Sequence, residues 1–115
     1  MENAVFLNVY KLKKGANVED FKAAAKRLVE DEISKARGFI SSTLMVDGDT
    51  WVDTIVFETK EDMELFEATA KKPSELAKEF YSYINFMAKG NTMKRLSVVS
   101  QIGRRNDEEF YRIRN

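Results

Sequence analysis

The sequence predicts an α+β protein built on an antiparallel sheet, and three observations lead to this fold class. Two β-rich runs, 39–46 and 50–58, are joined by Asp47-Gly48-Asp49, and an Asp-Gly pair between such runs is the strongest short-range hairpin signal. Amphipathic helical patterns lie on both sides of this hairpin in the chain. A further β-rich run stands near each end of the sequence. The expected order of elements is therefore β-α-β-β-α-β.

The first strand is expected over residues 4–12, AVFLNVYKL, which are mostly β-branched or aromatic. Successive residues of a strand point to opposite faces of the sheet. One face of this strand carries Val5, Leu7 and Val9, and the other carries Phe6, Asn8 and Tyr10. Because both faces are largely apolar, the strand is expected to be covered on both sides.

The first helix is expected between Asn17, which is placed to cap its N-terminus, and Gly38. After the hairpin, Thr59 and Asp62 form a capping-box-like start for a second helix. This helix is interrupted at Lys72-Pro73-Ser74, since proline disfavours helix for the residue before it, and Ser74 can cap the helical run that follows. A third helical run is expected to reach Gly90 and to present Leu76, Phe80, Tyr83, Ile84 and Met87 on one stripe. The last strand is expected from Met93 to Ile102.

This order is the ferredoxin-like, split βαβ arrangement, a four-stranded antiparallel sheet with helices on one face. We expect one domain over residues 4–102 and a charged C-terminal extension over residues 103–115. Since helices cover only one face, the apolar residues of the other face need a partner, and a second copy of the same sheet is the simplest one. We therefore expect a homodimer. The residues concerned are Val5, Leu7, Val9, Val52 and Val56.

Composition excludes several classes of function. The chain has 115 residues, with 19 basic and 19 acidic side chains, so the charge footprint of a nucleic-acid-binding protein is missing. It has no cysteine and no histidine, which removes thiolate chemistry, the commonest general base and the usual haem ligand. No apolar run approaches the roughly 20 residues that span a bilayer, and no signal peptide is evident. We expect a cytoplasmic protein without metal or cofactor.

The pattern resembles the dimeric α/β-barrel superfamily, and within it the antibiotic-biosynthesis-monooxygenase-like group. The resemblance covers roughly residues 4–102. It rests on Asn8 followed by Lys13-Lys14-Gly15, on Gly38-Phe39 at the start of the second strand, on the run from Trp51 through Phe57 to Asp62, and on the break 72–76 between two helical pieces. It implies two sheets packed face to face in a dimer and a pocket between sheet and helices in each subunit.

Two branches of this group differ in what the resemblance implies. In the haem-degrading branch the pocket uses an asparagine, which matches Asn8, a tryptophan, whose position falls on Phe57, and an iron-ligating histidine, whose position falls near Phe80 or Tyr81. Haem degradation by that route is therefore not expected. In the cofactor-independent branch the resemblance implies oxygenation of electron-rich phenolic or quinol-like compounds, in which the substrate itself supplies electrons to oxygen.

The predicted pocket follows from the alternation along the strands. An antiparallel pairing that sets Phe6 near Phe57 brings Asn8 near Ile55 and Tyr10 near Asp53, although a slip of one residue would turn every side chain over. Asn8 and Asp53 are the candidate catalytic residues. The predicted lining residues are Phe6, Tyr10, Trp51, Ile55, Phe57, Phe80, Tyr83 and Met87.

Asp53 lies among large apolar side chains, where loss of water raises the pKa of a carboxyl unless a donor such as Tyr10 or Tyr83 holds it charged. It is then a candidate general base; alternatively, it makes one structural hydrogen bond or lies near a rim. Asn8 either orients a ligand oxygen or satisfies backbone groups. Trp51 either stacks on a flat ligand or belongs to the core or dimer contact.

The sequence thus leaves three functional readings. The first is a small-molecule-binding protein resembling cofactor-independent monooxygenases, acting on a hydrophobic aromatic compound. The second is a non-catalytic ligand-binding or stress-associated module, which predicts a small or collapsed cavity and no role for Asp53. The third is haem binding through a tyrosine, Tyr81 or Tyr83.

Overall fold

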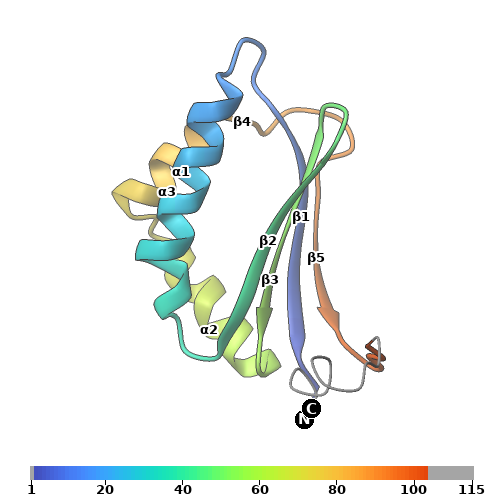
Figure 1. Ribbon diagram of the computed structural model, residues 1–115. Helices are drawn as coiled ribbons and strands as arrows, with labels where there is room; N and C mark the ends of the chain where they lie inside the picture. Colours follow the sequence, from blue (N-terminus) through green and yellow to red (C-terminus); the bar gives the residue numbers. More distant parts are fainter. Residues whose placement is uncertain (1, 104–115) are drawn as a thin grey trace, which may run out of the picture.

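A layer of helices packs against one face of an antiparallel sheet (Figure 1), in a computed structural model that describes residues 2–103. The order confirms the predicted β-α-β-β-α-β arrangement, with the second helix in two pieces. The elements are β1 (Ala4–Leu12), α1 (Val18–Asp31), the 3₁₀ turn η1 (Ile33–Lys35), β2 (Phe39–Asp47), β3 (Thr50–Phe57), α2 (Lys60–Ala70), α3 (Glu75–Ser82), β4 (Ile84–Asn85) and β5 (Thr92–Ser97).

All three predicted helix caps form. The Asn17 side chain accepts a hydrogen bond from the Asp20 backbone N–H, and Thr59 accepts one from Asp62 at the start of α2. Ser74 accepts one from the Ala77 N–H at the start of α3. These side chains satisfy backbone donors that would otherwise have no partner in the first helical turn. The break around Pro73 therefore divides the helical layer as the sequence predicts.

The sheet is centred on β1. On one side of β1 lies β3, and β2 lies beyond β3 at the edge of the sheet. On the other side, β5 pairs with β1 along Ala4–Val9. The short strand β4 pairs with the far end of β1, at Lys11 and Leu12. The predicted four strands are present, and β4 is an addition to them.

The expected third helical run to Gly90 is wrong beyond Ser82. The chain leaves the helix at Tyr83, whose carbonyl accepts a hydrogen bond from the Lys13 N–H at 2.8 Å, and then pairs as β4 with β1. This pairing satisfies the backbone of an open strand edge and buries Ile84, which is 4% exposed. As a consequence Met87 lies past the helix, and 91% of its surface is exposed.

The last strand is also shorter than the predicted Met93–Ile102, because β5 ends at Ser97, opposite Ala4. After the bond from the Val98 N–H to the Asn3 carbonyl at 2.9 Å, β1 has no further residue to pair with. The charged extension predicted for residues 103–115 lies, apart from its first residue, outside the described residues.

The pairing of β1 with β3 differs from the predicted one by two residues. Phe6 lies opposite Ile55, Asn8 opposite Asp53 and Tyr10 opposite Trp51. Because side chains alternate with a period of two, this shift leaves every residue on the face that the sequence predicts. The polar residues Asn8 and Asp53 thereby become direct cross-strand neighbours on the helix-covered face.

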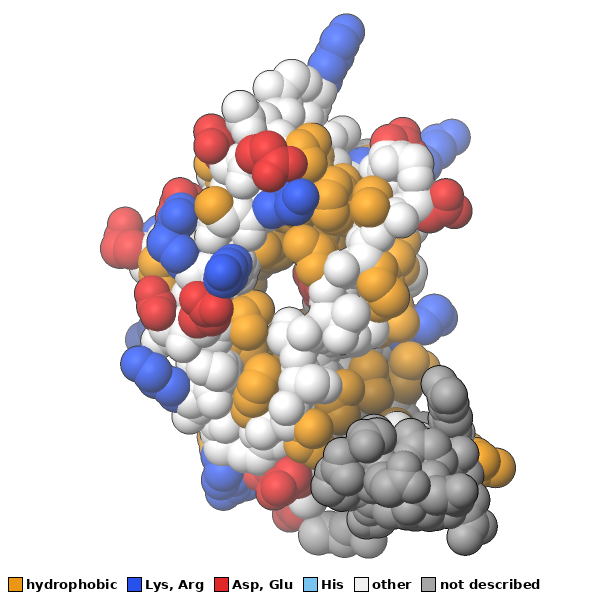
Figure 2. Space-filling view, in the orientation of Figure 1, with side chains coloured by type: hydrophobic (Ala, Val, Ile, Leu, Met, Phe, Trp, Pro, Cys, Tyr) orange, Lys and Arg blue, Asp and Glu red, His pale blue; other side chains and the backbone are white. Residues whose placement is uncertain are grey.

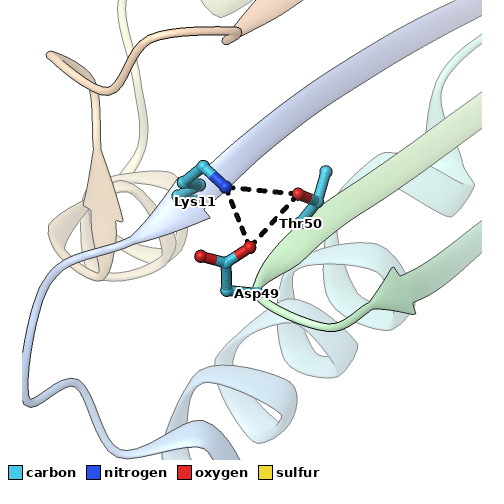
Figure 3. Close-up of polar contacts among 3 residues, drawn as sticks. All are labelled: Lys11, Asp49 and Thr50. Atoms are coloured by element: carbon cyan, nitrogen blue, oxygen red, sulfur yellow. Dashed lines mark hydrogen bonds and ion pairs between the residues drawn. The ribbon is translucent and has the colours of Figure 1, made fainter.

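The hairpin turn is fixed to the end of β1 by a small polar cluster (Figure 3). The Lys11 ammonium lies 2.8 Å from the Asp49 carboxylate and 3.3 Å from the Thr50 hydroxyl. Asp49 belongs to the turn and Thr50 begins β3, so the cluster joins the hairpin to β1. Alternation along the strands places Lys11 and Thr50 on the same face as Val9 and Val52. The cluster accounts for these side chains without a ligand.

A close contact fixes the start of α2 against the start of β2. Asp62, only 7% exposed, accepts a hydrogen bond from the Arg37 Nε at 2.6 Å. The neighbouring Gly38 has a φ of +77°, which favours glycine. A Cβ on Gly38 would lie 2.7 Å from the Asp62 Cβ and closer still to its carboxyl group. The glycine therefore permits both the turn and the close approach of α2.

Among residues 2–103, no helix covers the other face of the sheet (Figure 1). The alternation along β1, β3 and β5 points a largely apolar set of side chains to this open face, namely Val5, Leu7, Val9, Val52, Val56 and Leu96. The first five are partly exposed, and Leu96 is 41% exposed. No helix in the described part of the chain is long and apolar enough to cross a membrane.

Candidate functional site

A cavity of about 710 Å³ lies between the helical layer and the inner face of the sheet. Figure 2 shows the hollow between these two layers, bordered largely by hydrophobic side chains. Volumes of this size are typical of sites for small organic molecules. The sheet contributes Phe6, Asn8, Tyr10, Asp53 and Ile55, and the helices contribute Leu28, Phe66, Ala70, Phe80 and Tyr81.

Asp53 is the centre of the polar group in this cavity. Its Oδ1 accepts a hydrogen bond from the Asn8 amide at 3.0 Å, and its Oδ2 accepts one from the Tyr10 hydroxyl at 2.8 Å. Burial raises the pKa of the Asp53 carboxyl, and the two hydrogen bonds act in the opposite direction because they favour the charged form. The result is a partly desolvated carboxylate with two fixed donors, which is the arrangement expected of a general base.

Tyr10 supports Asp53 from the core. Burial raises the pKa of the Tyr10 hydroxyl, and the neighbouring Asp53 charge and hydrogen bond raise it further. The ring is 5% exposed and packs edge-on against Phe21 and Phe80, each with 6.2 Å between ring centres. Tyr10 therefore remains a protonated donor, and the packing of its ring fixes the direction of the bond.

The orientation of two amide side chains follows from their partners. A carboxylate only accepts hydrogen bonds, so the Asn8 Nδ2 faces Asp53 and its oxygen remains available as an acceptor. Asn91, just before β5, donates from Nδ2 to the Asn85 carbonyl at 2.8 Å. Its buried Oδ1 has no hydrogen-bond partner among the described residues. This part of the cavity wall is therefore rich in acceptors.

Some of the predicted lining residues line the cavity and others do not. Phe6, Tyr10, Ile55 and Phe80 line it together with Asn8 and Asp53, whereas the lining residues that the structure describes do not include Trp51, Phe57, Tyr83 and Met87. Phe57 is fully buried against Phe66, with 5.3 Å between ring centres. Trp51 and Tyr83 pack on Phe21 at 5.0 and 6.0 Å. Met87 is exposed because α3 ends before it.

The sequence did not indicate the contribution of β5 and α2 to the cavity. Met93 and Arg95 come from β5, and Glu67 and Lys71 come from α2 and the residue after it. The pairing of Phe6 with Arg95 places this arginine on the same face as Asn8. Alternation along the last strand puts Met93 and Arg95 on one face of that strand. Whether this is the helix-covered face depends on the register of the strand against β1, and the sequence contains no signal for that register.

The opening beside α2 is lined by charged residues. The Arg95 Nε donates to the Glu67 carboxylate at 2.6 Å, which joins β5 to α2. The same guanidinium lies over the Phe6 ring, 5.9 Å from its centre. Lys71 also lines the cavity, and it has no acidic partner within ion-pair distance among residues 2–103.

The residues present do not suit haem or a metal ion. The chain has no histidine, and burial together with the charges of Asp53 and Glu32 raises the pKa of Tyr81, which disfavours the tyrosinate that binds iron. Tyr83, the other tyrosine considered, packs in the core. Within residues 2–103, no three or more acidic side chains come together in a group that could hold a metal.

No protein-family model matches the sequence, and none of the curated proteins matches it. Solved structures do match. A mutant of SnoaB, a cofactor-independent oxygenase from Streptomyces nogalater, superposes with a TM-score of 0.69 at 12% identity, covering 90% of this chain and 100% of that one.

Two further structures widen the comparison. A monooxygenase from the gene ActVA-Orf6 of Streptomyces coelicolor, in complex with the ligand Nanaomycin D, has a TM-score of 0.67 at 16% identity, covering 90% and 94% of the two chains. A heme-degrading protein from Mycobacterium tuberculosis has a TM-score of 0.54 at 22% identity, covering 89% and 97%. The chain therefore has an α+β ferredoxin-like fold of the antibiotic-biosynthesis-monooxygenase-like type.

Proposed function

We propose that this protein is a cofactor-independent, monooxygenase-like enzyme that acts on a hydrophobic aromatic compound. The observation that carries the proposal is the Asp53 carboxylate, held by Asn8 and Tyr10 in the wall of an apolar cavity of about 710 Å³. The fold shared with SnoaB and with the ActVA-Orf6 enzyme supports the same reaction class.

In the proposed reaction, Asp53 removes a proton from a phenolic hydroxyl, and the Asn8 amide oxygen orients the ligand. The electron-rich phenolate then reduces dioxygen, which is the oxidant. One oxygen atom forms a new carbonyl on a ring carbon that loses its hydrogen, and the other leaves as water, so that a phenol and dioxygen give a quinone and water. The protein supplies binding, orientation and the base.

The size of the cavity supports this proposal over a module with a small or collapsed pocket. The rival hypothesis is a protein that binds the ligand without converting it, and an activity test distinguishes the two hypotheses. Asp53→Asn keeps the shape of the side chain, can still accept from Asn8 and can donate to the Tyr10 oxygen, so we expect it to fold. It cannot act as a base.

The experiment measures dioxygen consumption and quinone formation with a panel of naphthols and anthrones. We expect turnover by the wild-type protein and a loss of at least about a hundredfold in Asp53→Asn, the usual contribution of a general base. The matched control is Asp47→Asn, since Asp47 is exposed at the end of β2 and does not line the cavity. Unchanged turnover in Asp53→Asn would remove this residue from the mechanism. Binding of the compounds by the wild-type protein without turnover would favour the non-catalytic ligand-binding module.

We also propose that the protein is a homodimer that buries the open sheet face between two copies. Two observations support the proposal: the side chains of this face are largely apolar, and the helices that the structure describes all cover the other face. Light scattering should give twice the chain mass. A Val52→Lys variant introduces a charge into this face and should give monomers, whereas a monomeric wild-type protein would contradict the proposal.

A further inference from the structure

We propose that the opening of the cavity beside α2 binds an anionic group of the ligand, which makes the ligand a hydroxylated aromatic acid rather than a neutral phenol. This inference rests on the proposed function, because it assigns a second polar contact to the same cavity. It follows from the distribution of charge along the cavity wall.

Three charged side chains form the opening: Glu67, Lys71 and Arg95. Glu67 and Lys71 are four residues apart at the end of α2, and residues so spaced lie on the same side of a helix. Arg95 reaches Glu67 from β5 at 2.6 Å and is neutralised by it. Lys71 lacks an acidic partner within ion-pair distance in the described part of the chain, so these three side chains carry a net positive charge.

The wall around Asp53 has the opposite character. The carboxylate takes the Tyr10 hydroxyl proton and one of the two N–H donors of the Asn8 amide, so Asn8 still offers its oxygen and one N–H. A ligand carboxylate placed here would face another buried anion with a single Asn8 N–H to compensate it, whereas a hydroxyl could donate to Asp53. A ligand with both groups is therefore oriented with its hydroxyl at Asp53 and its acid at Lys71.

The sheet fixes the scale of such a ligand. Asp53 lies opposite Asn8 on one side of β1, and Arg95 lies opposite Phe6 on the other side. The usual strand spacing and rise place the Cα atoms of Asp53 and Arg95 about 12 Å apart. The side chains of the two residues take up part of this distance, and a fused aromatic system with polar groups at its two ends spans the rest. The apolar residues between these ends, such as Phe6 and Phe66, would cover its rings.

The test uses four probes of one shape. These are a hydroxynaphthoic acid with its hydroxyl and carboxylate at opposite ends of the ring system, its methyl ester, its methyl ether, and the naphthol that lacks the carboxyl group. The ester removes the anion and the ether removes the donor. Affinities are measured by titration calorimetry at low and high sodium chloride, for the full-length protein and for Lys71→Gln.

We expect the acid to bind the wild-type protein about fivefold more tightly than the ester, since a partly exposed charge contact is worth no more than about this factor. Lys71→Gln should remove this advantage and leave the affinity for the ester unchanged, and added salt should weaken binding of the acid only. The control is Lys60→Gln at the other end of α2, where the lysine pairs with Glu64.

Two results would overturn the inference while the proposed function stands: equal affinities for acid and ester, or an equal loss for both in Lys71→Gln. An ether that binds as tightly as the acid would refute the assigned orientation. Failure of all four probes to bind would instead count against the proposed function, and the inference would fall with it.

Discussion

Replacing Gly38 by alanine tests how α2 is held in place. The residue combines a φ of +77° with the close approach of Asp62, whereas Gly15 has a φ of +82° and nothing within 4 Å of the position that a Cβ would take. Gly15→Ala therefore measures the cost of the backbone conformation alone, which is about 1 to 2 kcal/mol for a residue with a side chain.

Gly38→Ala adds the displacement of Asp62 to this cost. A Cβ at this position would lie 2.7 Å from the Asp62 Cβ, so either α2 or the side chain must move and the Arg37 contact is disturbed. Overpacking of this kind costs about 1 to 3 kcal/mol. We expect Gly38→Ala to lower the free energy of unfolding by about 2 to 5 kcal/mol in total.

Urea unfolding of both variants, followed by circular dichroism, measures the difference. Equal destabilisation of Gly38→Ala and Gly15→Ala would refute the claim that Asp62 lies against this glycine. Gly38→Ala should also weaken ligand binding, because it displaces α2, which carries Phe66, Glu67 and Ala70 in the cavity wall. Gly15→Ala should leave binding unchanged.

Three further predictions follow from individual contacts. Tyr10→Phe removes a hydrogen-bond donor that favours the charged form of Asp53, so the pKa of Asp53 should rise further. The acidic limb of the pH–rate profile should then move to higher pH, whereas the control Tyr83→Phe, outside the cavity wall, should leave this limb unchanged. The hydrogen bond from Arg37 lowers the pKa of Asp62. The contribution of this bond to stability is therefore present above the unfolded-state pKa of Asp62 and is lost as the pH falls through the folded-state pKa. Arg37→Gln should destabilise the protein at neutral pH, and urea unfolding should show that its difference from wild type vanishes in acid. Ile84→Ala should cost about 2 to 5 kcal/mol in the same assay, and Met87→Ala less than about 0.5, because only the first side chain is buried.

The local signals of the sequence determined most of the fold. Asn17, Thr59 and Ser74 each carry a side-chain oxygen that can satisfy a backbone N–H, so the helix starts are encoded within a few residues. Asp47-Gly48-Asp49 defines the hairpin in the same local way. Strand alternation then put Asn8 and Asp53 on the helix-covered face, and this assignment is insensitive to a register error of two residues.

Only the tertiary structure decided what lies next to what. The end of α3 depends on an open edge of β1 that takes up Ile84 and Asn85, and no residue near Met87 signals that competition. The contact of Asn8 with Asp53 depends on register, and the charged opening depends on β5 meeting α2 through Arg95 and Glu67. Such contacts join residues far apart in the chain, and their energy comes from packing and pairing partners that local sequence patterns do not contain.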